Sequence, residues 1–92
     1  MPQPKRRKVT DQVLIQLVEA DVDIGFGLVD AAKAYRASGQ VAFSSRALHD
    51  ATEILDDIES RLKQLGQAES APFLLLVIEL RKEIAAAERE LS

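Results

Sequence analysis

Hydrophobic residues recur at helical spacing along three segments of the chain, and the clearest pattern lies between Gln40 and Leu65. Apolar and small residues recur there every seven positions in two sets, which together form one a/d seam. The sets are Val41, Leu48, Leu55 and Leu62, and Ser44, Ala51, Ile58 and Leu65. The outward positions of this segment are mostly charged or polar. The pattern predicts a helix with one face in a core and the other in water.

Glycine marks the end of each of the first two helical segments. Gly39 and Gly66 occupy these positions, and glycine is the commonest residue just past a helix C-terminus. Thr10 or Asp11 can cap the first helix, and Pro72 suits the first turn of the third. Because short connections make neighbouring helices antiparallel, we predict an all-α, three-helix up-down-up bundle over residues 10–92. Its helices are expected at about residues 10–38, 40–65 and 70–91.

The first predicted helix is apolar around more of its circumference than a three-helix monomer can bury. It carries two apolar seams. The first seam is Val13, Leu17, Ala20, Ile24, Gly27, Ala31 and Ala34. The second seam is Ile15, Val18, Val22, Gly25, Val29 and Ala32, with Phe26 beside it. A helix that is apolar nearly all round is typical of the inside of an assembly.

The third predicted helix adds two apolar residues that lie away from its core stripe. The core stripe is Phe73, Val77, Leu80, Ile84, Ala87 and Leu91, whereas Leu75 and Ile78 project from the opposite side. In an up-down-up bundle the first and third helices start at the same end. We therefore predict that a homodimer completes the bundle, through one contiguous patch. Its residues are Ile15, Val18, Val22, Phe26, Val29, Leu75 and Ile78. The alternative to an interface is that these side chains are singly exposed apolar residues, which are common on protein surfaces and need no partner.

Asp21 is the one carboxylate within the apolar arc of the first helix, between Leu14 and Leu28. A buried carboxylate needs a partner. If the second helix, which is antiparallel to the first, supplies the partner, Arg61 should lie near Asp21. If the third helix, which is parallel to the first, supplies it, Arg81 should lie there. We predict a structural ion pair here in preference to a catalytic acid.

Composition and length place the chain among small globular domains. It has 92 residues, of which 47% are hydrophobic and 29% charged. The longest apolar run, Phe73 to Ile78, is far shorter than the ~20 residues that span a bilayer, so we expect no membrane segment. Cysteine is absent, which is compatible with the reducing cytoplasm and excludes disulfides and thiolate chemistry.

Charge is unevenly distributed along the chain. The run from Lys5 to Lys8 carries +4 in a chain whose net charge is −3, which leaves −7 on the rest. We predict that residues 1–9 form a disordered basic tail, because Pro2, Pro4 and the basic run offer no apolar anchor. The tail also resembles a nuclear-import signal. An acidic body repels phosphate, so we rank nucleic-acid binding through this tail second, as the alternative function.

Candidate chemical motifs in the sequence are incomplete. A calcium loop beginning at Asp21 would need an acid at Ala32, and a dinucleotide loop beginning at Gly25 would need glycine at Asp30. His49 and Glu53 lie one helical turn apart and make half of a metal site at most. We therefore expect no catalytic residues, no metal, no cofactor and no enzymatic activity.

The segment from Leu28 to about Asp56 resembles a tetratricopeptide helical hairpin. The residues that carry the resemblance are Ala32, Tyr35, Gly39 and Ala51, with Leu48 in an aromatic position. The segment departs from the family pattern at Leu28, Ser44 and Asp56, where tryptophan, alanine and proline are usual, and the chain has no second repeat. Bundles of the microtubule-interacting-and-trafficking type look similar. The resemblance implies a scaffold that binds other helices or peptides, so we predict a non-enzymatic interaction module that self-associates, with an unidentified protein or peptide as a further partner.

Overall fold

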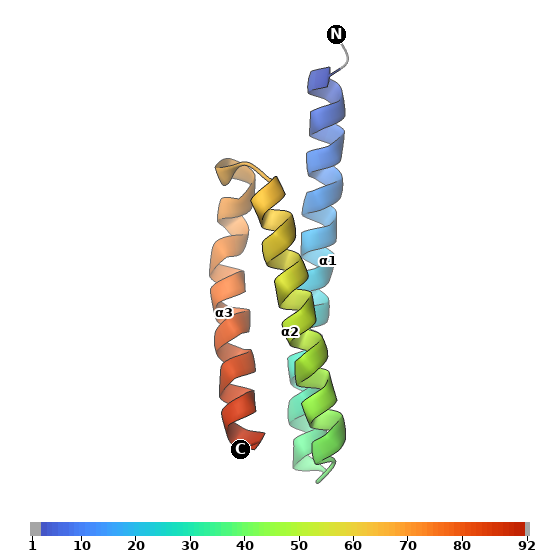
Figure 1. Ribbon diagram of the computed structural model, residues 1–92, viewed down its shortest axis with the longest axis vertical. Coiled ribbons are helices and arrows are strands. Elements are labelled where there is room, and N and C mark those ends of the chain that lie inside the picture. The colour runs from blue at the N-terminus through green and yellow to red at the C-terminus, as the bar shows by residue number, and fades with distance from the viewer. Residues whose placement is uncertain (1–2, 92) are drawn as a thin grey trace.

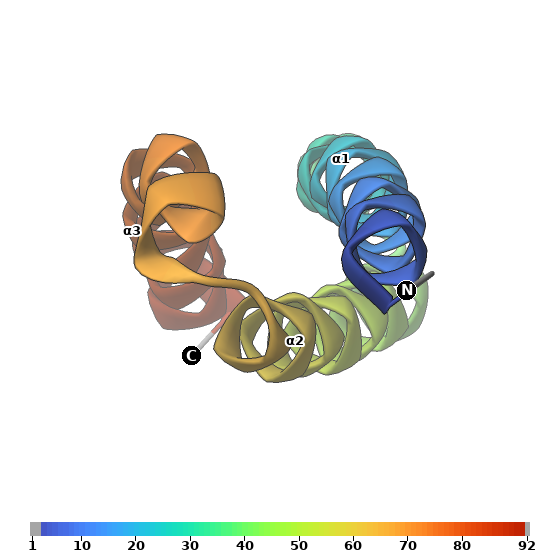
Figure 2. The same cartoon turned by 90° about the horizontal axis from the view of Figure 1, so that it is seen from above.

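Three helices make up the computed structural model of the chain, which describes residues 3–91 and, for residues 3–10, the backbone alone. They are α1 (Gln3–Ala37), α2 (Val41–Gln64) and α3 (Gln67–Leu91). α1 and α3 run in the same direction and α2 runs against them (Figure 1). Seen along the bundle, α1 and α3 flank α2 on its two sides (Figure 2). The predicted all-α up-down-up bundle is confirmed.

The turn between α1 and α2 has the geometry that glycine makes possible. Gly39 adopts a φ of +77°, a conformation that other residues seldom adopt. Its N–H donates to the carbonyl of Arg36 at 3.0 Å, and the N–H of Gln40 donates to the carbonyl of Tyr35 at 2.8 Å. These two bonds are those of a Schellman motif, which satisfies carbonyls left free at the helix end. The predicted stop at Gly39 is confirmed.

The start of α1 differs from the prediction. The structure begins the helix at Gln3 instead of near Thr10, so the backbone of residues 3–9 continues the helix. That residues 1–9 are disordered in the free protein stays a prediction. Pro4 then occupies the first turn, where no backbone N–H is needed, and lysine and arginine favour helix over most residues. Residues 1 and 2 of the predicted tail lie outside the described residues.

The start of α3 also comes earlier than predicted, at Gln67 instead of near Ser70. Pro72 therefore lies in the second turn and cannot donate to the carbonyl of Ala68, four residues before it. Both residues are exposed, so water can reach that carbonyl. The early start is tolerated because the missing bond is on the surface.

The core lies along one face of each helix. The predicted α3 stripe is confirmed, with Phe73, Val77, Leu80, Ile84 and Ala87 all buried. The α2 seam is also buried, apart from its first residue. Val41 is 55% exposed. The end of α3, at Leu91, packs beside Ala47 and Leu48, so α3 stops more than one helical turn short of Val41.

Gly25 lets α1 and α3 approach closely. A Cβ at this position would lie 2.8 Å from Cδ2 of Leu80, and 3.6 Å from Cγ2 of Ile54 on α2. Leu80 is fully buried, so a Cβ at position 25 would have to displace it within the packed core. At Gly27, on another face of α1, no described atom lies within 4 Å of an added Cβ. Within the bundle, the absence of a side chain therefore admits a neighbouring helix at Gly25 and not at Gly27.

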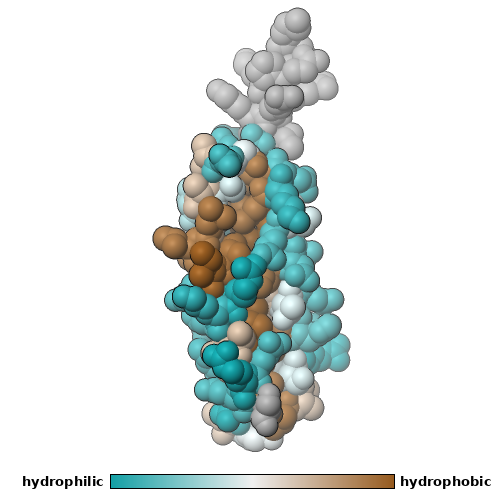
Figure 3. Space-filling view, turned by 60° about the vertical axis from the view of Figure 1, so that its left-hand side comes forward, coloured by the Kyte–Doolittle hydropathy of each residue, from teal (hydrophilic) through white to brown (hydrophobic). Residues whose placement is uncertain are grey.

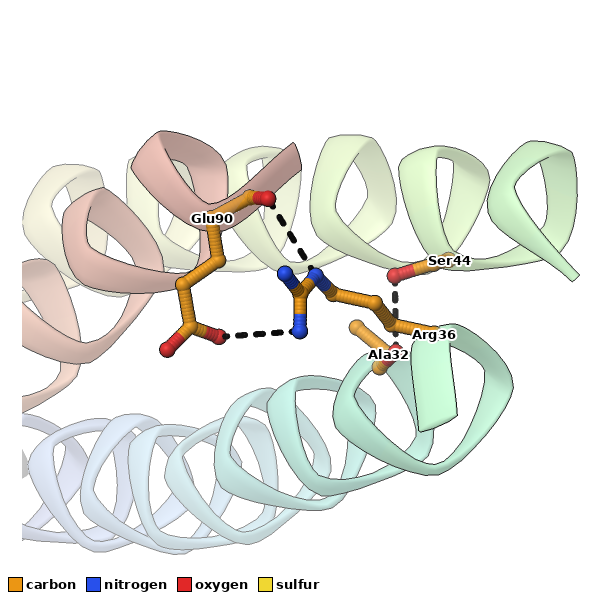
Figure 4. A network of polar contacts seen from close by, with 4 residues as sticks. All are labelled: Ala32, Arg36, Ser44 and Glu90. Atoms are coloured by element: carbon orange, nitrogen blue, oxygen red, sulfur yellow. Dashed lines mark hydrogen bonds and ion pairs between the residues drawn. The ribbon is translucent and has the colours of Figure 1, made fainter. Parts of the chain in front are cut away.

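Polar contacts join the three helices in the half of the bundle that carries the turn between α1 and α2 (Figure 4). The buried hydroxyl of Ser44 on α2 donates to the carbonyl of Ala32 on α1 at 2.7 Å. Nε of Arg36, in the last turn of α1, donates to the carbonyl of Glu90 near the end of α3 at 3.2 Å. Its Nη1 lies 4.0 Å from the carboxylate of the same residue. These contacts connect α1 to both neighbours at the closed end of the hairpin.

The two helical glycines provide a matched test of this packing. Gly27→Ala should raise the free energy of unfolding by about 0.5–1 kcal/mol, because alanine is the better helix former and meets no described atom. Gly25→Ala makes the same backbone gain but drives its Cβ into Leu80, so a net loss of about 1–2 kcal/mol is expected. Urea unfolding measures both. Equal stabilisation by the two substitutions would contradict the close contact between α1 and α3.

Candidate interaction surface

Asp21 and Arg61 form the ion pair predicted between α1 and α2. Nη1 of Arg61 donates to Oδ2 of Asp21, and the two side chains are 30% and 14% exposed. Arg81 does not take part in this pair. Its guanidinium donates to Glu59 of α2 instead, because Asp21 and Arg81 both point toward α2, from opposite sides of it. The predicted pairing with Arg81 is therefore wrong.

The valines predicted to lie at a dimer interface are in the core of the monomer. Val18 and Val29 are completely buried and Val22 is 6% exposed. Ile15 and Phe26 are partly buried and pack against the same core. These five residues of α1 therefore do not form the outer surface that the sequence predicted.

The two apolar seams of α1 face the reverse of the predicted directions: the second seam faces the core and the first faces outward. They lie roughly 160° apart around the helix, and spacing alone does not say which of them faces inward. Gly25 and Ala32 on the second seam admit Leu80 of α3 and Ser44 of α2. The second seam therefore turns inward, and the first seam is left outside.

The first seam of α1 is the main exposed apolar surface on that helix, and we call it the outer strip. Val13 is 48% exposed, Leu17 41% and Ile24 49%. The small residues of the strip are exposed too, except for the partly buried Ala31. The strip is Val13, Leu17, Ala20, Ile24, Gly27, Ala31 and Ala34.

Exposed apolar residues continue from the outer strip onto the turn between α1 and α2. Tyr35 packs against Phe43 with ring centroids 5.5 Å apart, yet both rings are more than one-third exposed, as is Val41. Tyr35 and Phe43 also line a shallow groove of about 220 Å³ between the two helices, together with Leu28 and Ala31. The groove places the outer strip beside α2.

A second apolar surface covers the first half of α3. Leu75 is 78% exposed and Ile78 45%, as the sequence predicted. Leu74 and Leu76 are also exposed. We call these four residues the α3 patch. Figure 3 shows a hydrophobic area on this side of the molecule, in the half that carries the turn between α2 and α3.

The outer strip and the α3 patch are separate surfaces. Nζ of Lys33 lies 3.8 Å from the carboxylate of Glu83, which shows the side of α1 that faces α3. The residues of the outer strip lie on the flank away from that side, next to the groove with α2. The prediction of one contiguous patch across α1 and α3 is therefore corrected. Sequence reasoning identified both seams of α1 but chose the wrong one as external.

His49 and Glu53 form an exposed pair on α2. Nε2 of His49 lies 3.8 Å from the Glu53 carboxylate, and both side chains are about 70% exposed, as in an ordinary helical i, i+4 pair. A shallow groove of about 420 Å³ lies beside them, between α2 and the end of α3. Among residues 11–91, no three His, Cys, Asp or Glu side chains are grouped so that they could hold a metal.

Comparisons with known proteins find no family model, no curated protein and no solved structure that matches this chain. The resemblance to tetratricopeptide and microtubule-interacting-and-trafficking bundles therefore stays a prediction. None of the helices in the described part of the chain is long and apolar enough to cross a membrane. The two exposed apolar surfaces are the features on which a function can be argued.

The ion pair of Asp21 and Arg61 can be tested by removing each member. Arg61→Leu should lower the free energy of unfolding by about 1–3 kcal/mol, because it leaves a largely buried carboxylate without its cation. Asp21→Leu should have a smaller effect or none, since the long side chain of Arg61 can turn its charge to water. Thermal and urea unfolding measure both.

Arg81→Leu is the matched control for this test. It breaks the more exposed pair with Glu59 and should lower stability by less than about 1 kcal/mol. An Arg61→Leu protein as stable as Arg81→Leu would show that burial of Asp21 has no energetic consequence.

Proposed function

We propose that this chain is a non-enzymatic helical interaction module that associates with itself. The observation that carries the proposal is the gathering of large exposed apolar residues into the outer strip and the α3 patch. Monomeric soluble proteins expose many single apolar residues but seldom align them into surfaces of this kind. An aligned apolar surface favours contact with another protein surface.

The energetic argument follows from the exposure of individual side chains. Leu75 is 78% exposed and Ile24 49%, and burying a leucine or isoleucine fully contributes about 1.5–3 kcal/mol. A domain of 92 residues buries a smaller fraction of its surface than a larger protein does. Covering even a few of these residues therefore adds substantially to a modest stability.

The α1–α2 hairpin supplies the scaffold for such contacts. Gly39 closes the hairpin, and Ala32, Ser44 and Ala51 are buried between its helices. If the resemblance to tetratricopeptide hairpins is meaningful, a helix or peptide of an unidentified protein is a further partner. We place the protein in the cytoplasm because the chain has no cysteine, and the proposed activity needs no cofactor.

Contact with nucleic acid through the basic residues is the second candidate. It is favoured by the position of the run from Lys5 to Lys8 in the part of α1 that extends beyond the turn between α2 and α3 (Figure 1). Deleting residues 1–8 should abolish salt-dependent retention on duplex DNA if this candidate is right. Equal retention of the full and shortened chains would exclude it.

Sedimentation velocity of the full chain tests self-association. The monomer mass is 10.1 kDa, and we expect a larger species whose fraction grows with concentration, because the contact is made by surfaces of modest size. A mass that stays at the monomer value up to several hundred micromolar would overturn the proposal.

Paired glutamate substitutions locate the surface responsible. Leu17→Glu with Ile24→Glu disrupts the outer strip, and Leu75→Glu with Ile78→Glu disrupts the α3 patch. A pair that lies in the interface should weaken association at least tenfold, because it places charges where water is excluded.

The control pair is Ser60→Glu with Gln64→Glu, which adds the same charge at exposed polar positions of α2, outside both apolar surfaces. Circular dichroism confirms that each variant is folded. If the control weakened association as much as the other pairs did, added negative charge alone would be the cause.

A further inference from the structure

We infer that the outer strip of α1 binds the outer strip of a second copy, with the two α1 helices antiparallel about a two-fold axis near Ile24. This inference rests on the proposed self-association and assigns it to one surface and one orientation. A symmetric pair of this kind uses the same surface on both copies and closes at two subunits.

The distribution of side-chain size along the outer strip favours the antiparallel orientation. The larger residues, Val13 and Leu17, lie in its first half, and the small residues Ala31 and Ala34 lie in its second half. With the axis near Ile24, Val13 and Leu17 of one copy face Ala34 and Ala31 of the other, and Ile24 meets its own counterpart on the axis. Parallel pairing would set large against large and small against small, which leaves gaps that close packing does not tolerate.

The surroundings of Gly27 provide the space for such an approach. No described atom lies within 4 Å of the position that its Cβ would occupy, whereas Gly25 is already filled by Leu80 of the same chain. In the antiparallel register, Gly27 faces Ala20 of the partner subunit. The two α1 backbones can therefore come close together at the middle of the strip.

Charge also separates the two orientations. The run from Lys5 to Lys8 carries +4 and the rest of the chain −7. Parallel pairing would set the two basic runs side by side, where they repel each other. Antiparallel pairing places them at opposite ends of a helix pair, roughly 50–55 Å apart, which is several times the Debye length of about 8 Å.

The same register accounts for the apolar residues around the turn between α1 and α2. Tyr35, Val41 and Phe43 are each more than one-third exposed within one chain. In the antiparallel pair, the part of α1 that precedes Val13 lies opposite this turn. The extension of α1 beyond the other two helices (Figure 1) would thus lie over the α1–α2 turn of the other copy.

The expected size of the contact sets its strength. A helix pair about 40 Å long and 10–12 Å wide buries roughly 400–500 Å² on each copy. This area is below the ~800 Å² per partner of a standard interface, and the residues around the turn bring it closer to that value. We therefore expect a dissociation constant on the order of micromolar.

Disulfide cross-linking tests the orientation, because the chain has no cysteine of its own. We would make Val13→Cys and Ala34→Cys as separate full-length variants, mix them at 100 µM and oxidise them mildly. The antiparallel pair predicts a covalent dimer in the mixture and little in either variant alone. Ile24→Cys alone should cross-link across the two-fold axis. A bond within one chain is excluded, since each variant carries a single cysteine.

The control is Lys82→Cys, at an exposed position of α3 outside both apolar surfaces, which reports random collisions. Cross-linking of Val13→Cys with itself, in excess of the mixture, would show parallel pairing and overturn the inference. If the wild type sediments as a dimer and none of the α1 variants exceeds the control, self-association stands and the outer strip is not its surface. A wild type that is monomeric at all concentrations overturns both proposals.

Discussion

The close approach of α1 to its two neighbours is the constraint on which the rest of the structure depends. At Gly25 the absence of a side chain admits Leu80 from α3, and at Ala32 the backbone carbonyl accepts a hydrogen bond from the buried Ser44 of α2. Both contacts need small residues on the same side of α1. They settle the rotation of α1 about its own axis, because any other rotation would place larger side chains or charges at these points.

That rotation decides what the surface of the protein presents. α1 has two apolar seams, and a bundle of three helices covers one of them. Asp21 lies at the border between the seams, where Arg61 of α2 neutralises it. Beyond this border the side chains of Leu17 and Ile24 face outward. The exposed strip is therefore a direct consequence of the packing inside, and the surface proposed for association lies on the same helix that organises the core.

Helices α2 and α3 could be predicted closely from the sequence because each has a single apolar stripe. The stripe from Phe73 to Leu91 and the outward Leu75 and Ile78 were identified correctly on this basis. The orientation of α1 could not be predicted in the same way, because two seams with the same spacing give the same periodicity. The predicted pair of Asp21 and Arg61 did not resolve the choice, since Asp21 borders both seams. The helix starts differ from the prediction because it took Thr10 or Asp11 as the cap of the first helix and placed Pro72 in the first turn of the third.

Because the two exposed apolar surfaces are separate, the choice between them decides whether association stops at two copies. If the outer strip of one copy bound the α3 patch of another, the contact would be head-to-tail, and each added copy would leave a new strip and a new patch free. Such a contact closes into a ring or grows without limit. Pairing of two outer strips consumes the same surface on both copies, so the assembly stops at two. The proposed symmetric pair therefore avoids open-ended growth, and it would leave the α3 patch, whose most exposed residue is Leu75, available to a different protein.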